Sequence, residues 1–114
     1  MITIFGIPNC DTIKKARKWL EANDINYQFH DFRKDSLEKS NLTKWVKSVG
    51  WETLLNKRGT TWRQLSEKDK TNINESKAIK LMLAHPAMIK RPVLVMGKTV
   101  QVGFSEQDYK NLLK

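Results

Sequence analysis

In the first 32 residues the hydrophobic positions repeat first with the period of a strand, then with that of a helix, and then again with that of a strand. Residues 2–5 alternate β-branched and aromatic side chains and stop at the turn sequence of residues 6–9, as is typical of a short strand. From Asp11 to Ala22 apolar positions recur at helical spacing with basic residues between them. Residues 25–30 alternate again, which indicates a half-buried second strand. This order predicts a parallel pair of strands joined by a right-handed crossover.

The middle of the chain has a helical pattern and many polar residues. Apolar side chains between positions 42 and 49 follow the i, i+3, i+4, i+7 spacing of an amphipathic helix, and Gly50 follows as its C′ residue. Residues 51–55 are expected to add one turn. Residues 61–64 resemble a capping box that opens another helix, and a third helix is predicted over about residues 74–84.

The period returns to two near the C-terminus. Residues 93–96 and 99–102 flank Gly97-Lys98, which predicts an antiparallel hairpin. Ser105-Glu106-Gln107-Asp108 resembles a capping box at the start of a terminal helix. The last third of the chain therefore predicts two strands followed by a helix.

The whole order predicts an α/β fold with a thioredoxin-like mixed sheet, β-α-β followed by β-β-α, and an all-helical insertion at about residues 36–86. A ferredoxin-like α+β fold is the structural alternative, but the long helical middle fits it less well. A length of 114 residues is typical of one domain, so we expect a single domain over residues 1–114.

The charge of the chain favours anionic partners. Twenty-one lysines and arginines against 12 acidic residues give a formal net charge of +9. The basic residues are spread through every segment and no nucleic-acid-binding motif is present, so we do not expect nucleic acid to be a partner. No apolar run approaches the roughly 20 residues of a membrane span, and the N-terminus lacks the features of a signal peptide. We expect a soluble, cytoplasmic monomer that does not bind membranes.

Metal and disulfide chemistry have little support. The single cysteine excludes a disulfide framework and a cysteine zinc cluster within the monomer. His30 and His85 are far apart, and no HxxxH or CxxC spacing exists. We therefore expect no metal site and no bound cofactor.

That single cysteine, Cys10, stands between the first predicted strand and the first predicted helix. Its sulfur could receive the free N–H groups of the first helical turn, and helix N-termini and nearby cations favour the reactive thiolate. A small buried hydrophobe is the alternative interpretation. A helix end contributes only about 0.3–1 kcal/mol, so cations from elsewhere in the chain are needed. The candidates are Arg58 and Arg91, which lie in loops at predicted element boundaries, although either could be an ordinary solvated arginine.

Three further residues flank Cys10 and are candidates for substrate binding. They are Asn9, Thr12 and Lys14. For Lys14, a place on a solvated helix face is the alternative. Asp11 would oppose ionisation of the thiol if its carboxylate faced the sulfur.

Three separated sequence motifs resemble those of a known protein family. They are Pro8-Asn9-Cys10-Asp11-Thr12-Ile13-Lys14-Lys15-Ala16, Asn56-Lys57-Arg58-Gly59-Thr60-Thr61-Trp62-Arg63 and Ile89-Lys90-Arg91-Pro92-Val93-Leu94. In this order they resemble the ArsC/Spx family, and within it the YffB-like branch of arsenate-reductase-related proteins. The likeness covers essentially the whole chain and implies a thioredoxin-like core with a helical insertion.

The resemblance also implies a chemistry. The family's reductases are coupled to glutathione or glutaredoxin, and the cysteine at the Cys10 position attacks arsenate. Arginines at the Arg58 and Arg91 positions then hold the oxyanion and the thiolate. The bond between Arg91 and Pro92 would be the cis-proline bond of thioredoxin-like folds. Glutathione would be a co-substrate and not a bound cofactor.

Two departures from the family pattern weaken the case for arsenate. Arsenate reductases of the family carry a further arginine shortly before the last helix, where this chain has Val102-Gly103-Phe104-Ser105. Their cysteine is followed by a small Gly-Thr-Ser-type loop, whereas Asp11 here places a carboxylate beside the anion site. Both changes disfavour a doubly charged oxyanion.

The function predicted is a glutathione-dependent thiol reductase with one nucleophilic cysteine, whose covalent adduct is resolved by an external thiol. An internal Cys-x-x-Cys cycle is impossible because the chain has no second cysteine. The alternative is an Spx-like transcriptional regulator that binds RNA polymerase without a catalytic role. The two-cysteine switch of many Spx-type relatives is absent, because Ile13 stands where the second cysteine would be.

Overall fold

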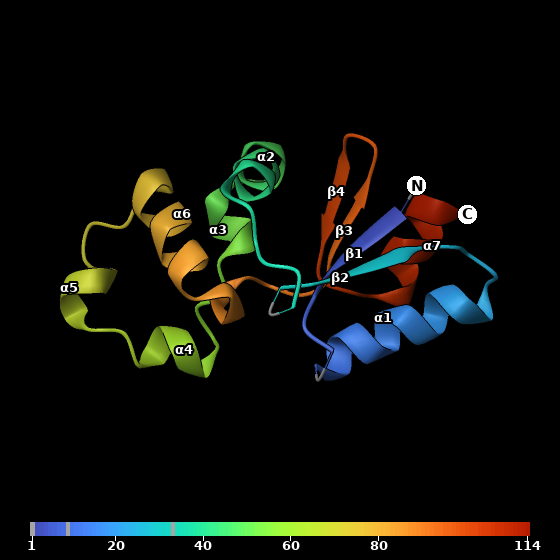
Figure 1. The fold of residues 1–114 in the computed structure, drawn as a ribbon, viewed down its shortest axis with the longest axis horizontal. Helices are drawn as coiled ribbons and strands as arrows, with labels where there is room; N and C mark the ends of the chain where they lie inside the picture. The colour runs from blue at the N-terminus through green and yellow to red at the C-terminus, as the bar shows by residue number, and fades with distance from the viewer. Residues whose placement is uncertain (1, 9, 33) are drawn as a thin grey trace. The chain divides into compact units, whose positions relative to one another are not determined.

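The computed structural model describes residues 2–8, 10–32 and 34–114. The chain divides into two compact units (Figure 1). The sheet unit consists of Met1–Ser36 and Arg91–Lys114, and the helical unit is Leu37–Lys90. The expectation of a single domain over residues 1–114 stays a prediction.

The sheet unit is built on four strands in the order β2-β1-β3-β4. Strand β1 (Ile2–Gly6) pairs in parallel with β2 (Gln28–Asp31) and antiparallel with β3 (Val93–Met96). Strand β3 continues through the predicted hairpin into β4 (Thr99–Val102). This mixed sheet and its element order confirm the predicted thioredoxin-like α/β fold.

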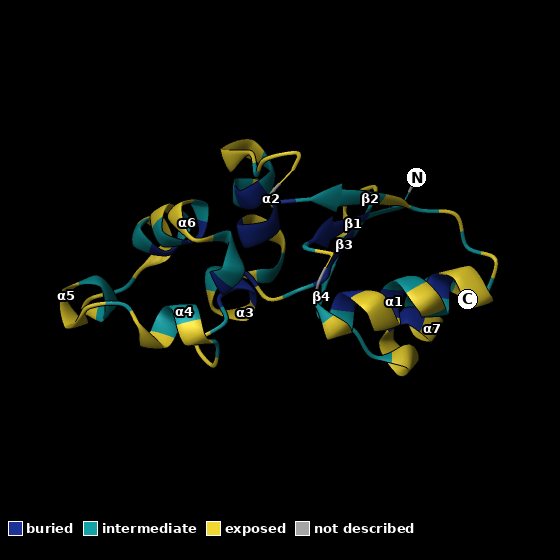
Figure 2. Ribbon diagram, turned by 60° about the horizontal axis from the view of Figure 1, so that its bottom comes forward, coloured by how far each residue is buried: buried dark blue, intermediate teal, exposed yellow. Residues whose placement is uncertain are grey.

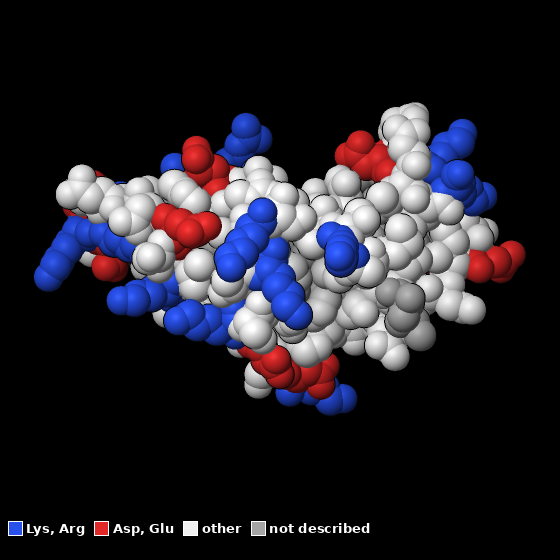
Figure 3. Space-filling model, turned by 90° about the horizontal axis from the view of Figure 1, so that it is seen from above, with Lys and Arg blue, Asp and Glu red and all other residues white. Residues whose placement is uncertain are grey.

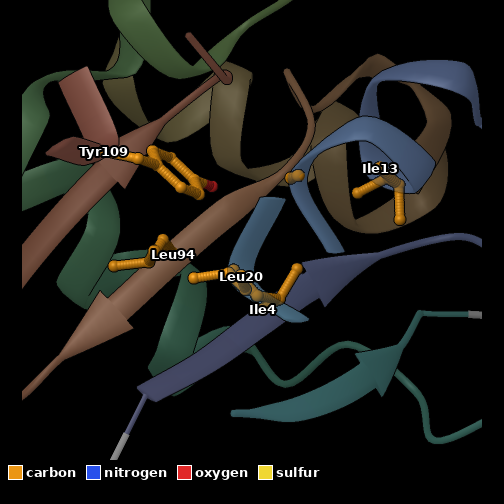
Figure 4. Close-up of a cluster of buried hydrophobic side chains, with 6 residues drawn as sticks. Ile4, Ile13, Leu20, Leu94 and Tyr109 are labelled. Carbon is orange, nitrogen blue, oxygen red and sulfur yellow. The ribbon is translucent and has the colours of Figure 1, made fainter. Parts of the chain in front are cut away.

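Two helices cover one face of this sheet. They are α1 (Asp11–Ala22) and α7 (Glu106–Leu113). Ile4 and Leu94 are direct partners in the β1–β3 register, so their side chains point to the same face. Six fully buried residues form the core there (Figure 4): Ile4, Ile13, Ala16, Leu20, Leu94 and Tyr109.

The opposite face of the sheet carries Phe5 and Val93, the next pair in the same register. Both side chains are buried. The Phe5 ring lies 4.9 Å from that of His30 and 6.4 Å from that of Phe32, centroid to centroid. Figure 2 shows the central strand β1 largely in the buried colour and the edge strand β2 in the intermediate one.

The helical unit holds five α-helices and one 3-10 helix among the described residues. They are α2 (Lys39–Val49), α3 (Trp51–Leu54), α4 (Thr60–Arg63), α5 (Glu67–Lys70), α6 (Glu75–Ala84) and η1 (Pro86–Met88). Its buried side chains come mainly from α2, α3, α6 and the segment after α6, and include Leu42, Trp45, Leu54, Met82 and Ile89. None of the helices in the described part of the chain is long and apolar enough to cross a membrane.

Helix caps decide where several elements begin. The side chains of Asn74 and Ser105 accept hydrogen bonds from amides three residues later, at 2.9 and 3.1 Å, and start α6 and α7 as expected. The expected cap within residues 61–64 is wrong, because α4 begins at Thr60 after Gly59. Helix α5, capped by Ser66, was not predicted from the sequence.

Strand β2 also begins later than predicted, at Gln28 instead of residue 25. Asp24 adopts a left-handed φ of 56°, and the Ile25 amide donates to the Leu20 carbonyl at 2.9 Å. These residues therefore close helix α1, and pairing with β1 starts only where Gln28 meets Thr3.

Tyr109 is buried at the centre of the helix-covered face. Its ring packs edge-on against Trp19 and Phe104, at centroid distances of 5.8 and 4.8 Å. In the described part of the chain its hydroxyl is buried without a hydrogen-bond partner. Burial raises the pKa of Tyr109 above its ordinary value of 10, because the phenolate would lose its hydration.

We expect Tyr109→Phe to leave the free energy of unfolding at neutral pH unchanged, or to raise it by up to about 1 kcal/mol, because it removes an unpaired buried hydroxyl. The folded state holds the phenol proton more tightly than the unfolded state does. The stabilisation from this proton is therefore complete below about pH 10 and is lost as the pH rises further. Urea unfolding at about pH 9 and 11 should show a smaller alkaline loss of stability in the variant than in wild type. A loss above about 1.5 kcal/mol at neutral pH would contradict an unpaired hydroxyl.

Candidate active site

All four strands contribute to one end of the sheet, and Cys10 follows one of them. Gly6, the last residue of β1, is paired with Asp31, the last residue of β2. Pro92 directly precedes β3, and its carbonyl accepts a hydrogen bond of 2.9 Å from the amide of Gly103, which directly follows β4. The loop that leaves β1 towards Cys10 therefore starts between the end of β2 and the start of β3, and Gly103 lies one strand further along the sheet.

Arg91 belongs to this end because of the β1–β3 register. Phe5 is paired with Val93, so the two residues before Val93 lie where the chain leaves β1. The Arg91 side chain is half-buried, and among residues 2–8, 10–32 and 34–114 its guanidinium has no hydrogen-bond or ion-pair partner. A partly buried cation without a partner favours an anion beside it. The peptide bond between Arg91 and Pro92 is cis.

Cys10 is the N-cap residue of α1 through its backbone. Its carbonyl accepts a hydrogen bond of 3.0 Å from the Lys14 amide. The expectation that the sulfur receives N–H groups of the first turn is wrong, because the side chain makes no capping hydrogen bond. It packs against the buried apolar cluster instead and stays half-exposed as a free thiol. The thiol is thus held from one side and open to reactants from the other.

Gly6 sets how closely β1 and α1 approach each other. A Cβ atom at Gly6 would collide with Cδ1 of Ile13 and come within 3.1 Å of its Cγ1. The Ile13 side chain is fully buried and has little room to move. Because Cys10 lies between this strand end and this helix turn, the missing side chain at Gly6 helps to fix its position.

The other candidates near Cys10 are distributed over the first turn of α1. Thr12 is half-buried, and Lys14 is exposed one turn after the cysteine. Asp11 is exposed on the same turn, so a carboxylate accompanies the lysine. Asn9 lies outside the described residues. The described part of this turn thus adds one cation and one anion to the site.

Arg58 belongs to the helical unit. Its side chain is exposed, and its amide donates to Asn56 Oδ1 at 3.1 Å. It lines a hollow of about 400 Å³ together with Lys57, Lys90 and Glu52. The structure therefore groups Arg58 with two lysines and one carboxylate, whereas Cys10 and Arg91 belong to the sheet unit.

Two backbone hydrogen bonds bring these lysines to one hollow. The Asn56 amide donates to the Met88 carbonyl at 2.7 Å, and the Lys90 amide donates to the Leu54 carbonyl at 2.8 Å. The bridge that these bonds form pairs Leu55 with residue 89. Sequence reasoning missed Lys57 and Lys90 as neighbours, because a one-residue bridge between distant segments leaves no periodic pattern.

Both basic and acidic side chains are visible on the face drawn in Figure 3. Among the residues that the structure describes, no group of three or more His, Cys, Asp or Glu side chains is arranged to hold a metal ion.

The chain is similar to known proteins over nearly its whole length. The ArsC family model matches residues 5–112. A solved structure of a YffB protein is 45% identical over the full length of both chains, with a TM-score of 0.97. An arsenate reductase (ArsC) related protein from Brucella melitensis is 48% identical over 99% of this chain and 94% of that one, with a TM-score of 0.80. The global transcriptional regulator Spx of Streptococcus mutans is 29% identical over 99% of this chain and 83% of its own.

The close approach at Gly6 gives a test of the site's framework. We expect Gly6→Ala to lower the free energy of unfolding by about 1–3 kcal/mol, because the new methyl group overpacks the contact with Ile13. Ile13→Val, which removes the colliding Cδ1 atom, should cost about 0.5–1.5 kcal/mol alone. Urea unfolding of the double variant should give a loss smaller than the sum of the two, since the deletion makes room for the insertion. Additive losses would show that the two residues do not limit each other.

Proposed function

Because the chain belongs to the ArsC family, we propose that it is a thiol reductase that uses Cys10 as its nucleophile and glutathione as its co-substrate. One observation carries this proposal. A half-exposed thiol and a half-buried arginine, Arg91, which has no partner among the described residues, belong to the same end of the sheet. A guanidinium is always charged, so it favours the thiolate and can bind an anionic group of a substrate at the same time.

The proposed reaction is a thiol–disulfide exchange in two steps. The Cys10 thiolate attacks the glutathione sulfur of a mixed disulfide, so a new S–S bond to glutathione forms and the substrate leaves as a thiolate. A second glutathione thiolate then attacks this adduct, which releases glutathione disulfide and restores the Cys10 thiolate. Over the two steps the sulfur of the incoming glutathione thiol is oxidised and the substrate sulfur is reduced, while the glutathione sulfur of the mixed disulfide stays at the disulfide level. The external thiol is needed because the chain has no second cysteine.

Glutathione mixed disulfides fit this site better than arsenate does. Gly103, whose amide binds the Pro92 carbonyl, offers no cation where reductases of the family have an arginine. Asp11 adds an exposed carboxylate beside Cys10. A doubly charged oxyanion would therefore meet less positive charge, whereas a disulfide sulfur needs no such compensation at the reacting atom.

In this proposal Arg58 supplies the second guanidinium, as the resemblance implies. Glutathione is a net anion, and within the helical unit Arg58 lines a hollow together with Lys57 and Lys90. Asn9, Thr12 and Lys14 are proposed to contact the substrate around the thiol. Glutaredoxin is an alternative source of the external thiol.

A second candidate function rests on the similarity to Spx, a relative called a global transcriptional regulator. Under this candidate the chain binds RNA polymerase and Cys10 has no catalytic role. Ile13 replaces the second cysteine of a redox switch, so such a regulator would not respond to oxidation by an internal disulfide. We favour the reductase because the two groups that its chemistry needs, the Cys10 thiol and the Arg91 guanidinium, belong to one end of the sheet.

The first test concerns the thiolate. We expect iodoacetamide at pH 7 to alkylate Cys10 faster than it alkylates glutathione, because nearby cations favour the reactive thiolate. Arg91→Ala should slow this alkylation by up to about tenfold, because the guanidinium charge is lost. Arg63→Ala, which removes an exposed arginine of α4, serves as the matched control and should leave the rate unchanged. A rate equal to that of glutathione that neither substitution changes would overturn the assignment of Cys10 as nucleophile.

The second test concerns turnover. Wild-type protein with glutathione should reduce a glutathione mixed disulfide, such as that of 2-hydroxyethanethiol, and Cys10→Ser should lose this activity by at least about a hundredfold, because the hydroxyl is not ionised at neutral pH. Arsenate should be reduced weakly or not at all. The glutathione disulfide produced, which is followed with added glutathione reductase as the coupling enzyme, measures both reactions.

Two outcomes would point elsewhere. Activity that survives in Cys10→Ser would show that another group reacts. Inactive wild-type protein that captures purified RNA polymerase, equally well with and without the Cys10 thiol, would favour the regulatory candidate.

A further inference from the structure

A second hollow lies in the sheet unit, and none of the described candidate active-site residues lines it. It measures about 370 Å³. Helix α1 provides one wall with a row of residues at i, i+3, i+4 and i+7, and the other wall is the start of α7 with the residue before its cap. The lining residues are Lys15, Lys18, Trp19, Ala22, Phe104 and Glu106.

The two aromatic walls of this hollow are held in place from behind. Trp19 and Phe104 both pack edge-on against Tyr109, with interplanar angles of 82° and 88°. Tyr109 is fully buried, whereas Trp19 and Phe104 keep part of their surface exposed. Their rings are therefore fixed before any ligand arrives, which lowers the entropy cost of binding a flat apolar group between them.

The charges at the rim select the sign of such a ligand. Lys15 and Lys18 stand one turn apart on the same face of α1, and both are exposed. Glu106, the first residue of α7, is the one acidic lining residue. Two ammonium groups and one carboxylate give the rim of the hollow a net positive charge next to its two aromatic walls.

We propose that this hollow binds a small aromatic anion, such as an aromatic carboxylate. The ring of the ligand lies against Trp19 and Phe104, and its acid group faces Lys15 and Lys18. Binding involves no covalent step and does not use Cys10, so the site is independent of the proposed reductase activity.

The test uses three probes with the same naphthalene ring and different charge: 2-naphthoate, 2-naphthylmethanol and 2-naphthylmethylammonium. Each is titrated into the isotope-labelled full chain, and the indole N–H signal of Trp19, assigned with Trp19→Phe, is followed by NMR. We expect the anion to bind more tightly than the alcohol, and the alcohol more tightly than the cation. An exposed charge pair changes affinity by about 1.5- to 5-fold.

Four variants locate the binding. Phe104→Leu, which keeps an apolar side chain in place, should weaken binding of all three probes by about 3- to 10-fold through the lost ring contact. Lys15→Gln with Lys18→Gln should reduce naphthoate binding to the level of the alcohol. Glu106→Gln should strengthen it by about 2- to 5-fold. Lys110→Gln, an exposed lysine of α7 outside the hollow, is the charge-matched control.

Equal affinity for the three probes would overturn the proposal, as would a Trp19 signal that none of them shifts. Naphthoate binding that is unchanged in the double lysine variant would also overturn it. Loss of activity in Cys10→Ser leaves all these results as they are, so failure of one proposal is distinguishable from failure of the other.

Discussion

The antiparallel register between β1 and β3 is the constraint on which the rest of the sheet unit depends. Ile4 opposite Leu94 gives α1 and α7 their apolar surface, and Phe5 opposite Val93 fills the other face. A slip of one residue would exchange the two faces. It would also move Arg91 relative to the strand end from which the chain continues to the cysteine, so one set of backbone hydrogen bonds serves both the core and the chemistry.

Most elements could be predicted from the sequence because each depends on local chemistry. Alternation identified β1 and the final hairpin, and the capping-box pattern at Ser105 identified where α7 begins. Short elements without periodicity, such as α5, were missed, because four residues are too few to show a helical face. The start of β2 was predicted too early, because Asp24 and Ile25 close helix α1 and pairing with β1 begins only at Gln28.

The candidate site could be predicted in its residue types and only partly in its arrangement. A lone cysteine after a strand and two arginines in loops are visible in the sequence, and the family motifs single them out. That the sulfur packs on the apolar cluster and receives no amide hydrogen bonds is decided by tertiary contacts. Lys90 lies near Arg58 because a bridge joins Leu55 to a segment that is distant in the sequence, and no local pattern encodes this bridge.

The presence of a single cysteine has a consequence for how long the oxidised form of its thiol survives. Two cysteines in one molecule meet at a high effective concentration, often millimolar or more, so an internal disulfide closes quickly. Cys10 has no such neighbour, and any disulfide it forms joins the protein to a second molecule. The lifetime of that adduct is then set by the abundance of small thiols in the surroundings, and the half-buried position of the sulfur restricts which of them can reach it.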